Sequence, residues 1–194
     1  MDPRFISIRA SSVPSYRHIG KDRYGAGAIS GALQHNGDMT DTSQSPSPVP
    51  SARSGPASVS ATRTGARTYI GRNARGSQVL IGPTDAPGHF TPGELLKLAL
   101  AGCAGMSSDR VTARRLGEDF ASTIWAHGES DPAEDRYFAI DEEVLLELNE
   151  LSEADKQKLL VVIGKAIAAS CTIARSVGGS IELNKSINAV PLHD

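Results

Sequence analysis

The stretch TPGELLKLALAGCAGMSSDRVTARRLG is the feature that most constrains the fold of this chain. Thr91 is suited to cap a helix, Pro92 fits the first helical position, and Glu94 completes a T-x-x-E capping box. Gly117 suits the end of the same helix. The sequence therefore predicts one long helix between these two ends, with Cys103 near its middle.

Cys103 lies on one side of this expected helix. Projected on a 3.6-residue period, that side carries Leu95, Leu96, Ala99, Cys103, Met106 and Ser107. Small residues surround the cysteine and would let another backbone approach closely, so we expect this side to face a protein interior. A cysteine in such a place is often a buried, inert thiol, and the alternative is the centre of a redox reaction. The helix alone leaves both interpretations open.

The composition of the chain changes near residue 56. Residues 1–56 are rich in Gly, Ser and Pro and contain too little apolar surface to order themselves, which predicts a disordered or loosely ordered N-terminal extension. Residues 57–194 have regular patterns and are expected to form one folded domain. Met39 begins a polar segment typical of a protein start, so we hypothesise that translation begins there.

The folded part has strands, a helix, strands, a helix and a strand in that order. Short strands are expected in ASVSATRT, ARTYIG and SQVLIG before the long helix, and in ASTIWAHGES and RYFAIDEEVLLELNEL after it. Ser152 is expected to cap a second helix that runs to about Ala169, with a core-facing stripe of Leu159, Leu160, Ile163 and Ile167. Cys171 opens a helical turn, and SIELNKSINAV is a last strand. This order indicates an α+β fold, and we expect the acidic residues of DEEVLLELNE on a solvated strand face.

Composition excludes several classes of function. The formal net charge of -2 gives no reason to expect nucleic acid as a partner, and the five His are not at metal-ligand spacing. No apolar run approaches the roughly 18 to 20 residues that span a bilayer, so no membrane partner is expected. The first residues do not resemble a secretory signal, which favours the cytoplasm. In that compartment two cysteines are more often free, catalytic or redox-active than a permanent disulfide.

The stretch TPGELLKLALAGCAGM resembles the signature helix of the OsmC/Ohr family of thiol-dependent peroxidases. The second family cysteine opens a short helical segment far downstream, and AASCTIARSV with Cys171 resembles that segment. The likeness covers roughly residues 57–190. It implies an intertwined homodimer, in which curved antiparallel sheets wrap around central cysteine-bearing helices and the active sites form at the subunit interface.

The resemblance also implies a reaction. Cys103 as thiolate would attack the O–O bond of a small hydroperoxide and become a sulfenic acid. Cys171 would then form a disulfide with it, and an external dithiol would restore both thiols without any cofactor. The alternative is a non-catalytic OsmC-like dimer that binds a small apolar ligand or acts as a redox-sensitive stress protein.

Two further site residues follow from the resemblance. The family uses an arginine from an N-terminal strand, and the turn TGAR makes Arg67 the first choice; the competitors are Arg63, Arg72 and Arg75. A glutamate at the start of the helix holds that arginine, and Glu94 is the nearest candidate. In the family this glutamate directly follows the proline, where this chain has Gly93. A shift of one residue turns a helical side chain by about 100°, and capping alone would also explain Glu94.

Overall fold

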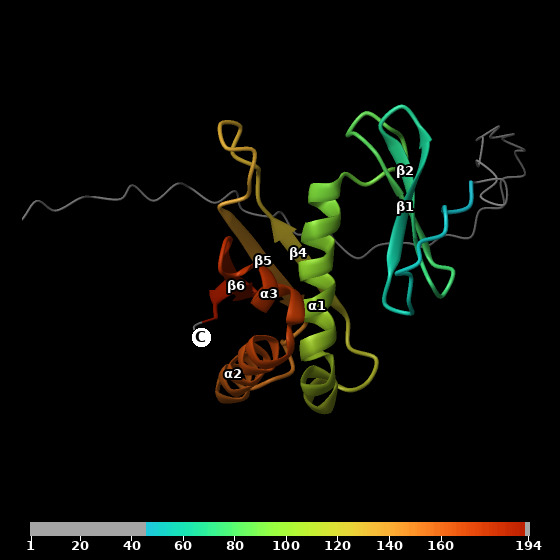
Figure 1. Cartoon of the computed structure of the whole chain (residues 1–194). Helices are drawn as coiled ribbons and strands as arrows, with labels where there is room; N and C mark the ends of the chain where they lie inside the picture. The colour runs from blue at the N-terminus through green and yellow to red at the C-terminus, as the bar shows by residue number, and fades with distance from the viewer. Residues whose placement is uncertain (1–45, 193–194) are drawn as a thin grey trace, which may run out of the picture. The chain divides into compact units, whose positions relative to one another are not determined.

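The computed structural model describes residues 46–192 (Figure 1). The hypothetical start at Met39 and most of the predicted N-terminal extension, 1–56, lie outside these residues. Residues 46–56 form turns and irregular chain, and the guanidinium group of Arg72 donates a 2.8 Å hydrogen bond to the carbonyl of Pro46. The boundary at residue 56 therefore remains a prediction.

The first three strands form an antiparallel sheet in the order β1-β2-β3. Their bounds are Val59–Gly65 for β1, Thr68–Asn73 for β2 and Gln78–Ile81 for β3, as the alternating sequence predicts. The two-residue turn between β1 and β2 contains Arg67, whose φ of 58° lies in the left-handed region. Ile70, on the central strand, is completely buried.

The long helix α1 spans Pro92–Leu116, and both of its predicted ends are confirmed. Thr91 caps it: the backbone N–H of Glu94 donates to the Thr91 hydroxyl over 3.2 Å, and the Thr91 N–H donates to a Glu94 carboxylate oxygen over 2.7 Å. At the other end the N–H of Gly117 bonds the carbonyl of Ala113 over 2.8 Å. Local capping chemistry is therefore sufficient to place this helix.

The buried side of α1 differs from the predicted one. The buried residues are Leu100, Ala101, Ala104, Ser108, Thr112 and Ala113. Met106, predicted to face the interior, is 85% exposed, and Cys103 is half-buried at the border. Small residues face inward because β4 packs close: a Cβ atom added to Gly105 would stand only 2.9 Å from Cδ1 of Ile124.

The remaining strands form a second sheet in the order β4-β5-β6-β7. Their bounds are Ser122–His127 for β4, Ala139–Leu146 for β5, Glu182–Ile187 for β6 and Val190–Pro191 for β7. The β5–β6 pair is parallel, unlike the antiparallel pairing expected, because the connection between these strands crosses over through two helices. The α+β class with two sheets and helices is confirmed.

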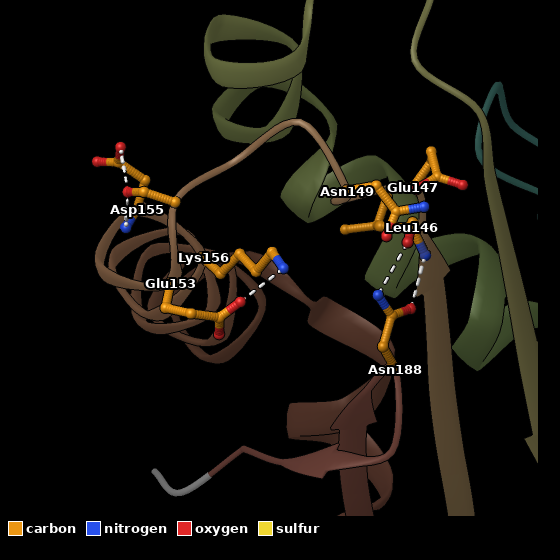
Figure 2. Close-up of polar contacts among 8 residues, drawn as sticks. Leu146, Glu147, Asn149, Glu153, Asp155, Lys156 and Asn188 are labelled. Atoms are coloured by element: carbon orange, nitrogen blue, oxygen red, sulfur yellow. Dashed lines mark hydrogen bonds and ion pairs between the residues drawn. The ribbon is translucent and has the colours of Figure 1, made fainter.

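The predicted last strand is in fact two strands joined by a tight turn. Asn188 and Ala189 form the turn between β6 and β7, with φ values of 46° and 65°. The Asn188 side chain fixes this turn to β5, since its amide accepts from the N–H of Leu146 over 2.9 Å and donates to the Leu146 carbonyl over 2.8 Å (Figure 2). Asparagine tolerates the left-handed region better than most residues.

Helices α2 and α3, Glu153–Ser170 and Thr172–Val177, complete the core. The predicted stripe of α2 is confirmed, because Leu159, Leu160, Ile163 and Ile167 are all buried. Helix α1 packs against α2, α3, β4 and β5 (Figure 1). In residues 46–192 no helix is both long enough and apolar enough to cross a membrane.

Candidate active site

Cys171 lies at the junction of two helices. It follows the last residue of α2 and caps the start of α3, where its Sγ accepts a hydrogen bond from the N–H of Ala174 over 3.4 Å. The side chain has no exposed surface and belongs to the same core cluster as Val144 of β5 and Ile167 of α2. The sulfur is therefore enclosed within the folded core.

Cys103 meets Cys171 from helix α1. Both cysteines are free thiols, and Cys103 packs against the core cluster that contains Cys171. Cys171, the backbone N–H groups of Ile173 and Thr172 in the first turn of α3, and the side chain of Ser107 all favour the thiolate form of Cys103 and so lower its pKa. The structure thus brings the two predicted cysteines to the same core cluster.

The two thiols differ in acidity because their surroundings differ. Desolvation by burial disfavours the Cys103 thiolate, but the hydrogen bonds from Cys171, Ile173 and Thr172 outweigh it and hold the pKa of Cys103 below its ordinary value. Burial, together with the hydrogen bond to Cys103, raises the pKa of Cys171 to about 11. Cys103 is therefore the more acidic of the two thiols, and Cys171 the less acidic.

Glu142 is a third titratable group close to this pair, and the prediction of a solvated acidic face is wrong for it. The buried residues of β5 are Ile140, Glu142, Val144 and Leu146, all on one face of the strand. Glu142 is only 2% exposed, and the residues that the structure describes offer neither of its carboxylate oxygens a hydrogen-bond partner. Burial raises its pKa, and its charge in turn raises the pKa of Cys171.

Glu94 occupies the first turn of α1 and is engaged in the capping box. One of its carboxylate oxygens accepts from both the N–H and the hydroxyl of Thr91, over 2.7 Å and 3.0 Å. These hydrogen bonds, the backbone one foremost, lower its pKa. The side chain is exposed. Its local contacts are those of a helix cap.

Gly93 is closely covered by Tyr137. The phenol oxygen of Tyr137 lies where a Cβ atom at residue 93 would have to stand. Lys97 holds this ring, with its Nζ 5.7 Å from the ring centroid and 2.9 Å from the carbonyl of Gly128. A tyrosine therefore fills the space that a side chain at residue 93 would occupy.

The candidate arginines are all in or beside the first sheet. Arg67 is exposed in the β1–β2 turn, Arg63 is exposed in β1, and Arg75 is exposed in the β2–β3 turn. Within residues 46–192 no hydrogen bond or ion pair joins Arg67 to Glu94 or to either cysteine. The same described part of the chain holds no group of three His, Cys, Asp or Glu that could bind a metal ion.

The family model described as OsmC-like protein matches residues 83–185, which include both cysteines, α1 and the second sheet up to β6. The chain belongs to the OsmC-like family. An uncharacterized protein of Mycobacterium tuberculosis is 47% identical to it over 125 residues, which cover 64% of this chain and 91% of that relative. The family assignment made from the two cysteine motifs is thereby confirmed.

Solved structures show the same fold in other OsmC-like proteins and relatives. A hypothetical protein from Aquifex aeolicus superposes with a TM-score of 0.55 at 16% identity, covering 68% of this chain and 93% of that one. An OsmC-like protein from Mycoplasma pneumoniae superposes with a TM-score of 0.54 at 13% identity, covering 69% of this chain and 96% of that one. At these identities the similarity establishes the fold.

Proposed function

We propose that this OsmC-like protein is a thiol-dependent peroxidase that reduces organic hydroperoxides, and hydrogen peroxide as a second substrate. The observation that supports the proposal is that Cys103 packs against the core cluster containing Cys171, with the pKa of Cys103 lowered and that of Cys171 raised. A peroxidatic cysteine needs to be a thiolate near neutral pH, and a resolving cysteine has to be protected until its partner is oxidised.

In the first step the Cys103 thiolate attacks the nearer oxygen of the hydroperoxide. An S–O bond forms, the O–O bond breaks, and the leaving alkoxide takes up a proton to give an alcohol. The sulfur is oxidised to a sulfenic acid, and the peroxide is reduced. The backbone N–H groups of Thr172 and Ile173 would favour the thiolate form of Cys103 that this step needs.

In the second step the Cys171 sulfur attacks the sulfenic sulfur of Cys103. The S–S bond forms, the S–O bond breaks, and the oxygen leaves as water with the proton that Cys171 releases. An external small dithiol then reduces the disulfide by thiol exchange. A supply of such dithiols is characteristic of a reducing compartment, so we expect the protein to act in the cytoplasm.

The proposal includes a homodimer with Arg67 and Glu94 at the subunit interface. Arg67 is exposed at the tip of a hairpin, so its guanidinium group is accessible to a second copy of the chain. A cation near Cys103 would stabilise both the thiolate and the leaving oxygen. Glu94 has one carboxylate oxygen outside the hydrogen bonds of the capping box and would use it to orient the arginine.

The test is a titration of the reduced protein with cumene hydroperoxide and, separately, hydrogen peroxide, following free thiols and intact mass. We expect rapid loss of both thiols and of two hydrogen masses per chain. Cys103→Ser should abolish the reaction, and Cys171→Ser should leave a sulfenic acid that adds one oxygen mass. Two thiols that survive stoichiometric peroxide would overturn the proposal.

One observation favours a second candidate function, the binding of a small apolar ligand. A groove of about 340 Å³ lies beside α1 and is lined by Leu98, Gly102, Phe120, Ile124 and Leu146 among others, but by neither cysteine. It is large enough for a compact apolar molecule. Binding of an environment-sensitive apolar dye that is unaffected by Cys103→Ser, in a chain inert to peroxide, would support this candidate over the peroxidase.

A further inference from the structure

We infer that a groove beside the first sheet binds a small phosphate monoester whose remaining part is apolar or aromatic. The groove has a volume of about 640 Å³ and lies between the segment before β1, the start of β1 and the end of β2. It is lined by neither cysteine, nor by Arg67 or Glu94. The inference is therefore separate from the proposed peroxidase chemistry and does not depend on it.

The groove lies at the end of the β1–β2 hairpin that is opposite to its turn. Ser60 and Arg72 are register partners at this end, whereas Arg67 lies in the turn at the other end. Arg72 also fastens the preceding segment to the hairpin, because its Nη1 donates a 2.8 Å hydrogen bond to the carbonyl of Pro46 (Figure 1). One wall of the groove is thereby tied to the sheet.

The charge of this part of the chain is one-sided. Residues 46–84 contain five arginines and no lysine, aspartate or glutamate, whereas residues 85–192 contain ten Lys and Arg against seventeen Asp and Glu. Within the described residues none of the five arginines forms an ion pair. Like charges that lack counterions repel one another, so an anionic ligand would stabilise this region.

Two of these arginines, Arg53 and Arg72, line the groove. Arg72 is half-buried and makes one hydrogen bond, to Pro46, so most of its five N–H donors remain for a ligand. Ser54 and Ser60 add hydroxyl groups to the same lining. Two guanidinium charges match a phosphate monoester of about two negative charges better than a carboxylate of one, and the guanidinium fork fits phosphate oxygens.

The groove also has an apolar wall that no other part of the described chain covers. Val49 and Val59 are 89% and 79% exposed, and both line the groove together with Pro48 and Pro50. The volume lies in the range of small-molecule sites, so a bare phosphate ion would leave most of it to water. Cations beside uncovered apolar side chains therefore favour a ligand that has both a phosphate group and an apolar or flat body.

The experiment uses AMP as the probe, because it joins a phosphate monoester to a flat base. Calorimetric titration of the full-length protein at low salt compares AMP with inorganic phosphate and with adenosine. We expect AMP to bind more tightly than either, and its affinity to fall as salt is added. Absence of AMP binding, or binding of adenosine or phosphate as tight as that of AMP, would overturn the inference.

Matched variants locate the site. Arg53→Met should weaken AMP binding about tenfold, because it removes a charged hydrogen-bond donor. Its side chain makes no hydrogen bond within residues 46–192, so this variant should fold as wild type does. Arg63→Met removes an exposed arginine of β1 outside the groove and should leave the affinity unchanged.

Arg72→Lys is a second variant, which keeps the cation but loses the guanidinium fork, and it should also weaken AMP binding. Equal affinity of Arg53→Met and Arg63→Met for AMP would overturn the inference. Because no peroxide is used, failure of the peroxidase proposal would leave this result intact, and the reverse also holds.

Discussion

The phenol oxygen of Tyr137 lies against Gly93, in the space that a Cβ atom at residue 93 would need. The resemblance to the OsmC/Ohr peroxidases implied a glutamate at this helix position. Tyr137 can therefore take this position only because residue 93 has no side chain. Lys97 packs on the tyrosine ring.

Restoring a side chain at residue 93 should require the tyrosine to move. We expect Gly93→Glu to lower the free energy of unfolding by about 1–3 kcal/mol, because overpacking displaces the ring of Tyr137 from Lys97. In a Tyr137→Ala background the same substitution should cost much less. Chemical denaturation of the four chains measures this coupling, and equal costs in both backgrounds would contradict it.

Removing the donor on residue 171 should make Cys103 less acidic. Cys171→Ala deletes a hydrogen bond that lowers the pKa of Cys103, so this pKa should rise and alkylation of Cys103 near neutral pH should slow several-fold. Cys171→Ser is the matched control, because its hydroxyl retains a donor. Alkylation rates measured against pH give the answer, and an alanine variant as reactive as wild type would show that Cys171 plays no part.

The two roles of Glu94 can be separated. Glu94→Gln keeps a side chain that suits a capping box, whereas Thr91→Ala removes the cap and should cost about 1 kcal/mol of stability. If Glu94 also orients an arginine, Glu94→Gln should slow peroxide reduction while the thermal midpoint stays near that of wild type. Peroxide turnover and thermal melts of both variants test this, and unchanged turnover in Glu94→Gln would leave the residue a cap alone.

Glu142 should make stability depend on pH. Its folded-state pKa is raised above that of the unfolded chain, so the folded state holds this proton more tightly. Stability is then highest below the unfolded pKa and is lost as the pH rises through the folded pKa. At about pH 8 Glu142→Leu should be about 1–3 kcal/mol more stable than wild type, and the difference should shrink on acidification. Denaturation at several pH values measures it; a difference independent of pH would contradict the assignment.

A mixing experiment tests the interface role of Arg67. Chains with Arg67→Ala and chains with Cys103→Ser should each be weak or inactive as peroxidases. If the arginine of one subunit serves the cysteine of the other, refolding the two chains together should recover activity in mixed dimers. Arg63→Ala, also exposed in the same hairpin, is the matched control and should keep wild-type turnover alone.

Local chemistry made the helix ends and the cysteine motifs predictable. The capping box at Thr91 and the end at Gly117 involve residues within one turn of each other, so they can be read without knowing the fold. Cys103 and Cys171 were placed correctly on their helical segments for the same reason. Their unequal acidity was not predictable, since it arises from burial and from the backbone donors of α3.

Contacts between elements distant in the sequence explain where the predictions from sequence patterns were wrong. The apolar residues of α1 predicted one inward side, but the close approach of β4 turns alanines, Ser108 and Thr112 inward and leaves Met106 exposed. The parallel β5–β6 pairing depends on a crossover that strand periodicity does not encode. For Glu142 a signal existed, because it alternates in step with Ile140 and Val144; its charge was taken as a sign of solvent exposure.

Cys171 also has a task that is independent of its chemistry, since its sulfur accepts the N–H of Ala174 where two helices join. If the proposed peroxidase activity were lost, the thiol would no longer be needed, yet this corner would still need a small acceptor. Serine is then the replacement we would expect here, and alanine the one we would expect to be scarce. The presence of cysteine or serine at residue 171 is thus weaker evidence of redox activity than the presence of Cys103, which does not lie at a helix end.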